Sequence, residues 1–275
     1  MIEIKNLYFG YAHMPVFSNI SLNFEPGCIY GLLGENGVGK TTLLKLLSGL
    51  LHPTQGSCTI DNFTCADRTP QFLQNICFLP DEITVPSNAT PLSYIKQLVP
   101  FYPAYSEDAF LDMMRSLEVD PARKFKEMSF GQQKKSLIAC ALSLGTQYVL
   151  LDEPTNGLDI PSKANFRKIL GQRADNNACI IISTHQVKDV ENLIDPIIIL
   201  TNDDVLLNAS VQRITEQLSF VYDSQQRPDA LYSEMQPAGW LNVVPNTTGE
   251  ETLLNIEALF NAVLLNKEQV KNLFK

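Results

Sequence analysis

The stretch CIYGLLGENGVGKTTLLKLLSGL, residues 28–50, carries the pattern around which the rest of the chain is organised. It begins with an apolar run at residues 28–33 that is typical of a buried strand, and it ends in leucines at helical spacing. Between these two parts, Gly34, Gly39, Lys40 and Thr41 match the template G-x-x-x-x-G-K-[ST]. The strand–loop–helix order is the context that such a match requires.

The chemistry of phosphate binding explains this spacing. Glycines permit positive φ angles and lack Cβ atoms, so successive backbone N–H groups can surround a polyphosphate. The N-terminus of the following helix adds free N–H groups and partial positive charge. Lys40 is then expected to reach the β- and γ-phosphates, and the Thr41 hydroxyl to ligate Mg²⁺. A chance glycine-rich turn would not need the flanking strand and helix, so the stretch predicts a nucleoside-triphosphate site.

Composition and charge narrow the class of protein. A chain of 275 residues with 45% hydrophobic content can form one large domain with an appendage, or two domains. The formal charge of −9 disfavours binding to nucleic acid or to anionic lipid. The short basic groups at residues 123–126 and 134–135 are interpreted as solvated faces rather than binding patches.

Features that the sequence lacks narrow the class of protein further. No apolar run reaches the length of a membrane-spanning helix, and the N-terminus lacks the layout of a signal peptide. The six cysteines form no C-x-x-C pair and mostly lie in apolar runs. They therefore predict reduced thiols in the cytosol and no metal site built from cysteine.

The chain order predicts an α/β domain with a helical insertion. Residues 1–27 read as antiparallel β-structure with Tyr11 in a loop, and further strands are expected at residues 56–63 and 76–79. Residues 83–128 lose strand character and predict two helices, which begin at Thr90 and Ser106.

A second informative region starts at Met128. A helix is expected to end at Gly145, and an apolar strand at residues 148–151 ends in Asp152 and Glu153. Carboxylates at the carboxyl end of a parallel strand lie on the ligand-binding side of such a sheet. The strand at residues 179–183 ends in Thr184 and His185, next to the other strands of the site.

These motifs together resemble the nucleotide-binding subunits of ATP-binding cassette (ABC) transporters over residues 2–200. Residues 34–42 correspond to the Walker A phosphate loop, and MSFGQ at residues 128–132 is similar to the LSGGQ signature. LLDEP at residues 150–154 resembles the second Walker motif, GLD at residues 157–159 the loop after it, and His185 the switch histidine.

The resemblance implies a P-loop NTPase fold of the ABC-ATPase type. An N-terminal antiparallel β-subdomain and a mostly parallel core sheet flanked by helices are expected, with a helical subdomain inserted at about residues 83–145. The ABC ATPase domain would span residues 1–201, and residues 202–275 would form a C-terminal accessory module. Within that module, residues 211–218 read as helical and residues 254–264 as an apolar segment.

The resemblance also implies a role for each matching residue. Glu153 would polarise the attacking water, His185 would contact the γ-phosphate and orient that water, and Lys40 would act with them in catalysis. Tyr11 would stack on adenine. The implied metal-binding residues are Thr41, Asp152 and Asp81. The implied nucleotide-binding residues are Tyr11, Gly34, Glu35, Asn36, Gly37, Gly39, Lys40, Thr41, Thr42, Ser129, Gly131, Gln132 and Asp159.

Two positions depart from the family pattern. Phe130 replaces the first glycine of the signature, where related exporters tolerate substitution, whereas Gly131 retains the second. Asp81 stands where the family usually has a glutamine that contacts Mg²⁺ and the water. An aspartate is shorter and charged, so the metal geometry and the communication with a membrane partner are expected to differ.

The leading functional hypothesis is a Mg²⁺-dependent ATPase subunit of an ABC transporter. It would form a homodimer head to tail on ATP and drive a separate integral-membrane permease, which would dock near residues 83–128. It would lie in the cytoplasm, peripheral to the inner face of the cell membrane, and would touch the membrane only through the permease. Residues 254–264 resemble the C-terminal ends of single-cassette ATPases of multidrug, bacteriocin or antibiotic exporters, which favours export.

Two alternatives belong to other classes. A soluble ABC ATPase acting on nucleic acid or ribosomes usually carries two cassettes or long coiled-coil insertions and a more basic surface, none of which is seen here. A P-loop kinase is disfavoured by the signature and by His185.

Overall fold

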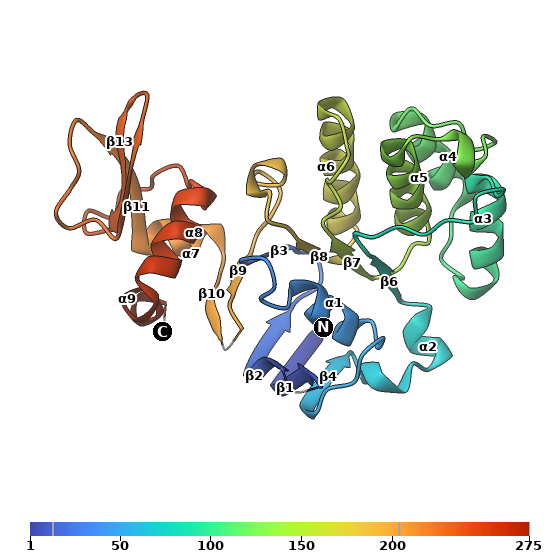
Figure 1. Ribbon diagram of the computed structural model, residues 1–275, viewed down its shortest axis with the longest axis horizontal. Coiled ribbons are helices and arrows are strands. Elements are labelled where there is room, and N and C mark those ends of the chain that lie inside the picture. The colour runs from blue at the N-terminus through green and yellow to red at the C-terminus, as the bar shows by residue number, and fades with distance from the viewer. Residues whose placement is uncertain (13, 203, 275) are drawn as a thin grey trace.

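The computed structural model describes residues 1–12, 14–202 and 204–274. Its centre is a six-stranded sheet in the order β10-β9-β3-β8-β7-β6 (Figure 1). All neighbouring strands pair in parallel except β10, which pairs antiparallel with β9 at one edge. The strands are β3 (Ile29–Leu33), β6 (Ile76–Leu79), β7 (Tyr148–Asp152), β8 (Cys179–Ser183), β9 (Ile197–Leu200) and β10 (Val205–Ala209). The predicted, mostly parallel core sheet is confirmed.

A smaller antiparallel sheet forms the N-terminal subdomain. Its order is β2-β1-β4-β5, from β1 (Ile2–Tyr11), β2 (Met14–Phe24), β4 (Gln55–Ile60) and β5 (Phe63–Thr64). The strand predicted at residues 56–63 is therefore two strands, because Asp61 takes a positive φ of 53° in the turn between them. Tyr11, expected in a loop, is the last residue of β1.

Helix α1 (Lys40–Leu47) joins the two sheets. Its leucines at positions 43, 44, 46 and 47 are all buried, and they belong to one apolar cluster with side chains of β1 and β8. Burying a leucine side chain contributes about 1.5–3 kcal/mol, so this helix is fixed firmly between the sheets. The phosphate loop that precedes it is thereby held on a rigid support.

The helical insertion follows β6 and α2 (Pro70–Leu73). It contains α3 (Pro91–Leu98), capped by Thr90, and α4 (Glu107–Ser116), capped by Ser106, which confirms both predicted starts. Then come α5 (Phe130–Ser143), which ends before the predicted Gly145, and α6 (Ile160–Asp175). Figure 1 shows α3, α4 and α5 grouped on one side of the sheet, with α6 next to α5.

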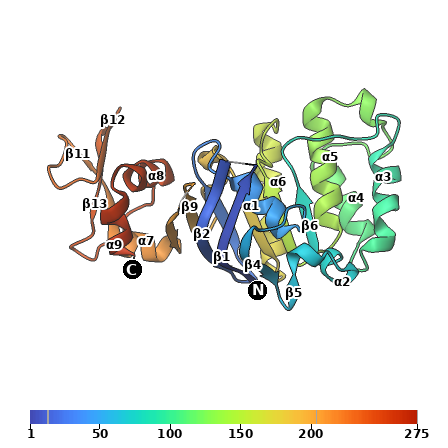
Figure 2. The ribbon, with the colours of Figure 1, turned by 60° about the horizontal axis from the view of Figure 1, so that its bottom comes forward.

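The C-terminal residues form a compact unit at the opposite end from the helical insertion (Figure 2). The segment predicted as helical, residues 211–218, is α7 (Val211–Gln217), and the apolar segment at residues 254–264 lies largely in helix α8 (Ile256–Leu265). The three-stranded sheet between them was not predicted. It has the order β11-β13-β12 and consists of β11 (Leu218–Asp223), β12 (Tyr232–Gln236) and β13 (Gly239–Pro245), and α9 (Lys267–Leu273) follows α8.

The cysteines behave as small apolar residues in this fold. Five of the six are buried, and Cys28 is half-buried. Burial raises the pKa of Cys77 and of Cys140 to about 12. Such thiols stay protonated at neutral pH and are poor nucleophiles. In the part of the chain that the structure describes, no helix is both long enough and apolar enough to cross a membrane.

Candidate functional site

The phosphate loop connects β3 to α1, as the sequence predicts. Gly37 and Gly39 have φ angles of 86° and 100°, which side chains rarely adopt. A Cβ atom on Gly39 would lie 2.6 Å from Val16 Cγ1, so the loop backbone packs directly on β2. At Gly37 a Cβ atom would meet nothing within 4 Å. The loop is therefore supported from behind and open at its tip, where Glu35 and Asn36 also lie.

Lys40 reaches back over this loop. Its Nζ atom donates hydrogen bonds to the carbonyl oxygens of Gly34 (2.7 Å) and Glu35 (3.1 Å). Burial lowers the pKa of the Lys40 ammonium, and the Glu153 and Asp152 carboxylates oppose that shift. Because an ammonium has three donors, the two bonds to the loop leave one for an anion.

Thr41 and Asp152 meet at the base of the loop. The Thr41 hydroxyl donates to Asp152 Oδ2 over 2.7 Å, and the Ser183 hydroxyl donates to Asp152 Oδ1. The carboxylate is almost fully buried. Hydroxyl and carboxylate oxygens are the ligands that Mg²⁺ prefers, together with water and phosphate oxygens. The residues present therefore fit a Mg²⁺ ion held by Thr41 and Asp152, which would neutralise charge on the phosphates.

Glu153 and His185 are brought together from neighbouring strand ends, because β7 and β8 pair in parallel and Asp152 lies opposite Ser183. The Glu153 carboxylate accepts hydrogen bonds from Thr184 Oγ1 (3.1 Å) and from the backbone N–H of His185 (3.0 Å). His185 Nδ1 lies 2.7 Å from Glu153 Oε1.

The backbone of Glu153 is strained. Its φ is 44°, a conformation that costs a non-glycine residue about 1–3 kcal/mol and that concentrates at functional sites. The Glu153 side chain is 11% exposed and that of His185 is 43% exposed. The Glu153 carboxylate is thus largely enclosed by protein, whereas the His185 imidazole is partly exposed to solvent.

The signature residues start helix α5. Ser129 Oγ accepts a hydrogen bond from the Gln132 N–H (3.3 Å), and Gln132 Oε1 accepts one from the Ser129 N–H (3.0 Å). This reciprocal capping box fixes the helix start. A Cβ atom on Gly131 would lie 2.6 Å from the Gly157 carbonyl oxygen, so only glycine fits there. Phe130 is accommodated because the residue is 54% exposed and its ring packs over Gly157.

The interpretation of residues 134–135 as a solvated basic face was wrong. The Lys134 side chain is fully buried, and Lys134 Nζ lies 3.3 Å from the Asp81 carbonyl oxygen and 3.4 Å from Asp81 Oδ1. Lys135 Nζ donates to Asp159 Oδ2 over 2.9 Å. Both lysines point from α5 towards acidic loops, a long-range pairing that no local pattern reveals.

Asp81 and Asp159 therefore have defined partners. Asp81 Oδ1 also accepts a hydrogen bond from Asn156 Nδ2 (3.1 Å), and a metal contact by Asp81 stays a prediction. Asp159 caps helix α6 by accepting from the Ser162 N–H (2.9 Å). Its bonds from Lys135 and Ser162 hold the pKa of Asp159 well below its usual range.

Tyr11 lies next to the start of α1. Its hydroxyl oxygen is 3.3 Å from Thr42 Oγ1, its ring meets Phe9 edge to face, and the residue is 46% exposed. An exposed aromatic ring at this place can take a base on its face, so adenine stacking stays a prediction that the geometry allows.

The C-terminal unit borders this site, which no sequence signal indicated. A cavity of about 480 Å³ is lined by Gly34, Glu35 and Asn36 of the loop and by Thr184 and His185. Its other wall includes Glu234 of β12 and three residues of α8, Glu257, Phe260 and Asn261.

Comparison with known proteins gives a consistent result. The sequence profile of a family described as ABC transporter matches residues 17–156. The uncharacterised ABC transporter ATP-binding protein YybJ of Bacillus subtilis is 36% identical, over 71% of this chain and 90% of its own length. The lantibiotic transport ATP-binding protein SrtF of Streptococcus pyogenes is 28% identical, over 82% of this chain and 97% of its own.

Solved structures show the same fold. A putative ABC transporter ATP-binding protein from Pyrococcus furiosus has a TM-score of 0.59 at 30% identity, covering 67% of this chain and 91% of its own. A dimeric post-hydrolysis state of the ATP-binding cassette MJ0796, bound to ADP and Pi, has a TM-score of 0.67 at 23% identity, covering 77% and 99%.

Proposed function

This chain belongs to the ABC transporter family as an ATP-binding and ATP-hydrolysing subunit, and we propose that two copies pair head to tail to power a separate membrane permease. Each ATP would lie between the phosphate loop of one copy and the signature of the other. ATP would join the two copies, and hydrolysis would release them.

The observation that carries this proposal is the split between two sets of residues. Lys40, Thr41, Asp152, Glu153 and His185 are grouped around the loop by the contacts described above, so one chain holds the phosphate and water-activating groups. Ser129 instead makes its hydrogen bonds with Gln132 of its own helix and is exposed at the N-terminus of α5. A helix N-terminus offers N–H groups and partial positive charge to an anion, and a second copy's γ-phosphate would supply that anion.

Within each composite site the side chains have separate tasks. Lys40 and the loop N–H groups hold the phosphates, and Thr41 and Asp152 hold Mg²⁺. Glu153 accepts a proton from the attacking water, since its carboxylate is fixed by Thr184 and His185. Tyr11 positions the base. Such a division matches phosphoryl transfer, in which positioning and electrostatic stabilisation supply most of the catalysis.

Export is the direction that we propose. The lantibiotic transport protein SrtF matches 82% of this chain, which is more than residues 1–201 contain, so the similarity extends into the C-terminal unit. The ATP-binding protein of a zinc uptake system, ZnuC of Bacillus subtilis, matches 72% at a similar identity of 28%. The wider coverage by SrtF supports export, with the subunit cytoplasmic and peripheral to the membrane through its permease.

The permease is proposed to dock on the helical insertion. Phe101 lies there with 69% of its surface exposed, close to α3 in the chain. Leu253 is equally apolar and 92% exposed, but it precedes α8 in the C-terminal unit. The two residues therefore form a matched pair for testing where a membrane partner binds.

A pull-down from detergent-solubilised membranes tests the function. We expect the wild-type chain to capture an integral-membrane protein whose recovery does not change with RNase. Phe101→Ser should reduce that recovery while ATPase activity is kept, and Leu253→Ser should not. Capture of ribosomal proteins that disappear after RNase treatment would instead favour the nucleic-acid alternative, against which the charge of −9 argues.

A further inference from the structure

Helix α5 carries a buried charge that the proposed reaction does not use. The side chain of Lys134 is fully buried, whereas Asp81, its acidic partner, is 41% exposed. Burial lowers the pKa of the Lys134 ammonium, and the carboxylates of Asp81, Asp152 and Glu153 oppose that shift. A buried ammonium is costly unless it is paired, so its position requires a reason.

The contacts of Lys134 join three elements. Its Nζ atom reaches both the carbonyl oxygen and the Oδ1 atom of Asp81, in the loop after β6. Asn156, in the loop between Glu153 and Asp159, donates to the same Oδ1. Asp81 Oδ1 is thus contacted both by Lys134 of α5 and by Asn156 of the loop after β7.

Lys135, the next residue of α5, makes a second contact between this helix and a loop of the site. Lys135 Nζ donates to Asp159 Oδ2 over 2.9 Å, at the start of α6. Two consecutive lysines of α5 therefore hold the two loops that border Asp152 and Glu153. Ser129, the cap of the same helix, is little more than one turn away.

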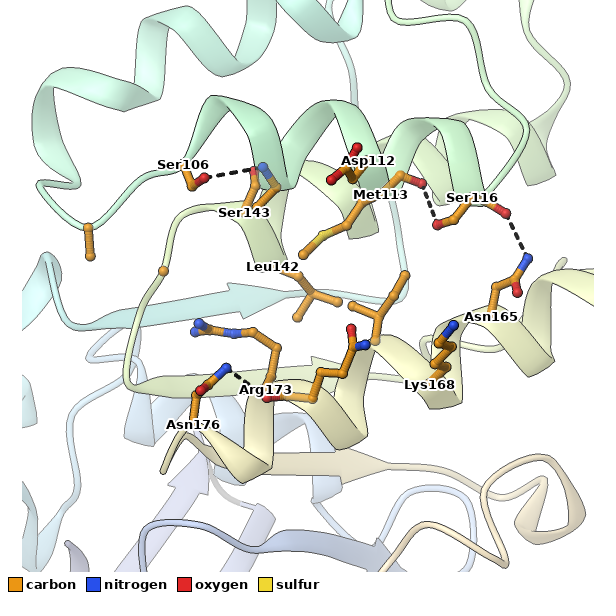
Figure 3. Close-up of a pocket in the computed structure, with 15 residues that line it drawn as sticks. Ser106, Asp112, Met113, Ser116, Leu142, Ser143, Asn165, Lys168, Arg173 and Asn176 are labelled. Atoms are coloured by element: carbon orange, nitrogen blue, oxygen red, sulfur yellow. Dashed lines mark hydrogen bonds between the residues drawn. The ribbon is translucent and has the colours of Figure 1, made fainter.

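A cavity borders the opposite end of α5, although the residues of that end, 136–143, are buried. A cavity of about 450 Å³ lies between α4, α5 and α6, and Figure 3 shows Leu142, Met113 and Arg173 around it. A hydrogen bond from Asn165 Nδ2 to the Ser116 carbonyl oxygen (2.7 Å) crosses from α6 to the end of α4 (Figure 3). Residues 129–133, at the start of α5, are exposed or half-buried, so the ionic contacts of Lys134 and Lys135 are important for the placement of that end of the helix.

We propose that Lys134 is a positioning residue that acts through Asp81. Lys134 neutralises the Asp81 carboxylate, which follows the strand next to the one that ends at Asp152. It also fixes the Ser129 end of α5 relative to the nucleotide site of its own chain. The second part rests on the proposed function, in which Ser129 completes the site of another copy. Without Lys134, the Asp81 carboxylate would add its charge to a site that must bind a polyanion.

A double-mutant cycle tests this proposal by nucleotide binding rather than by turnover. Lys134→Met, Asp81→Asn and the double variant are titrated with a fluorescent ATP analogue in EDTA. We expect Lys134→Met to weaken binding by about tenfold in the wild-type background, because an uncompensated carboxylate then repels the phosphates. With Asn at position 81, the same replacement should cost less than about threefold. Lys126→Met, at an exposed lysine before the signature, should change nothing.

The cycle separates positioning from packing. Equal losses in both backgrounds would overturn the proposal, since a lysine that serves packing alone does not depend on the charge of Asp81. If Lys134→Met does not fold, Lys134→Gln, which keeps an N–H donor, replaces it in the same cycle under the same two criteria. The titration is done at protein concentrations at which no dimer is detected. A chain that does not dimerise would therefore still give a measurable nucleotide affinity.

Discussion

Glu153→Gln is expected to lower ATP turnover by a factor of about 10²–10⁴ while ATP binding is kept. Glutamine has the shape of glutamate, and its one carbonyl oxygen can accept the hydrogen bond from the His185 N–H, while its NH₂ group can donate to Thr184 Oγ1. It cannot take up a proton. Both side chains tolerate the positive φ at this position to a similar degree, so the fold should be unchanged. Phosphate release measures turnover, and gel filtration with MgATP should show a trapped dimer.

Glu250→Gln is the control, because this glutamate is exposed in the C-terminal unit. It should turn over ATP at the wild-type rate. A Glu153→Gln chain that stays strictly monomeric with saturating MgATP would count against the dimer mechanism. Unchanged turnover would remove Glu153 from its proposed role.

Lys40→Ala has the second large expected effect, a loss of nucleotide affinity of about 100-fold. The Lys40 ammonium donates to the Gly34 and Glu35 carbonyl oxygens and interacts electrostatically with the buried Asp152 and Glu153 carboxylates. Charge-assisted hydrogen bonds contribute about 1.5–3 kcal/mol each, and a bound phosphate would add one more. Titration with a fluorescent nucleotide measures the affinity, and phosphate release measures the rate.

Lys45→Ala is the matched control on the same helix. Lys45 lies in the last turn of α1, away from the phosphate loop, and alanine favours helix as well as lysine does. We expect its nucleotide affinity to match the wild type. Wild-type ATPase activity in Lys40→Ala would show that Lys40 does not have the role assigned to it.

The elements that the sequence predicted well are those with local signals. The phosphate loop follows from glycines at fixed spacing, and the starts of α3 and α4 follow from the capping residues Thr90 and Ser106. The meeting of Glu153 with His185 followed from placing both at the ends of parallel strands, and the pairing of β7 with β8 confirms it.

The features that were missed depend on long-range contacts. Lys134 and Lys135 look like a surface pair in the sequence, because their partners Asp81 and Asp159 are distant along the chain. The sheet of β11, β12 and β13 lies in a stretch with prolines and serines that weaken strand patterns. The approach of α8 to the phosphate loop likewise arises only when the C-terminal unit packs on the core.

The claim that two chains build each ATP site is tested most directly by mixing two defective chains. One carries Lys40→Ala and the other Ser129→Arg, and both carry Glu153→Gln so that bound ATP persists. A mixed dimer then has one site with an intact Lys40 facing an intact Ser129, and one site with both defects. Gel filtration with labelled ATP should give dimers from the mixture alone, with half the ATP content of the Glu153→Gln dimer. If the mixture retains no more ATP than the two chains do separately, the two-chain site is contradicted.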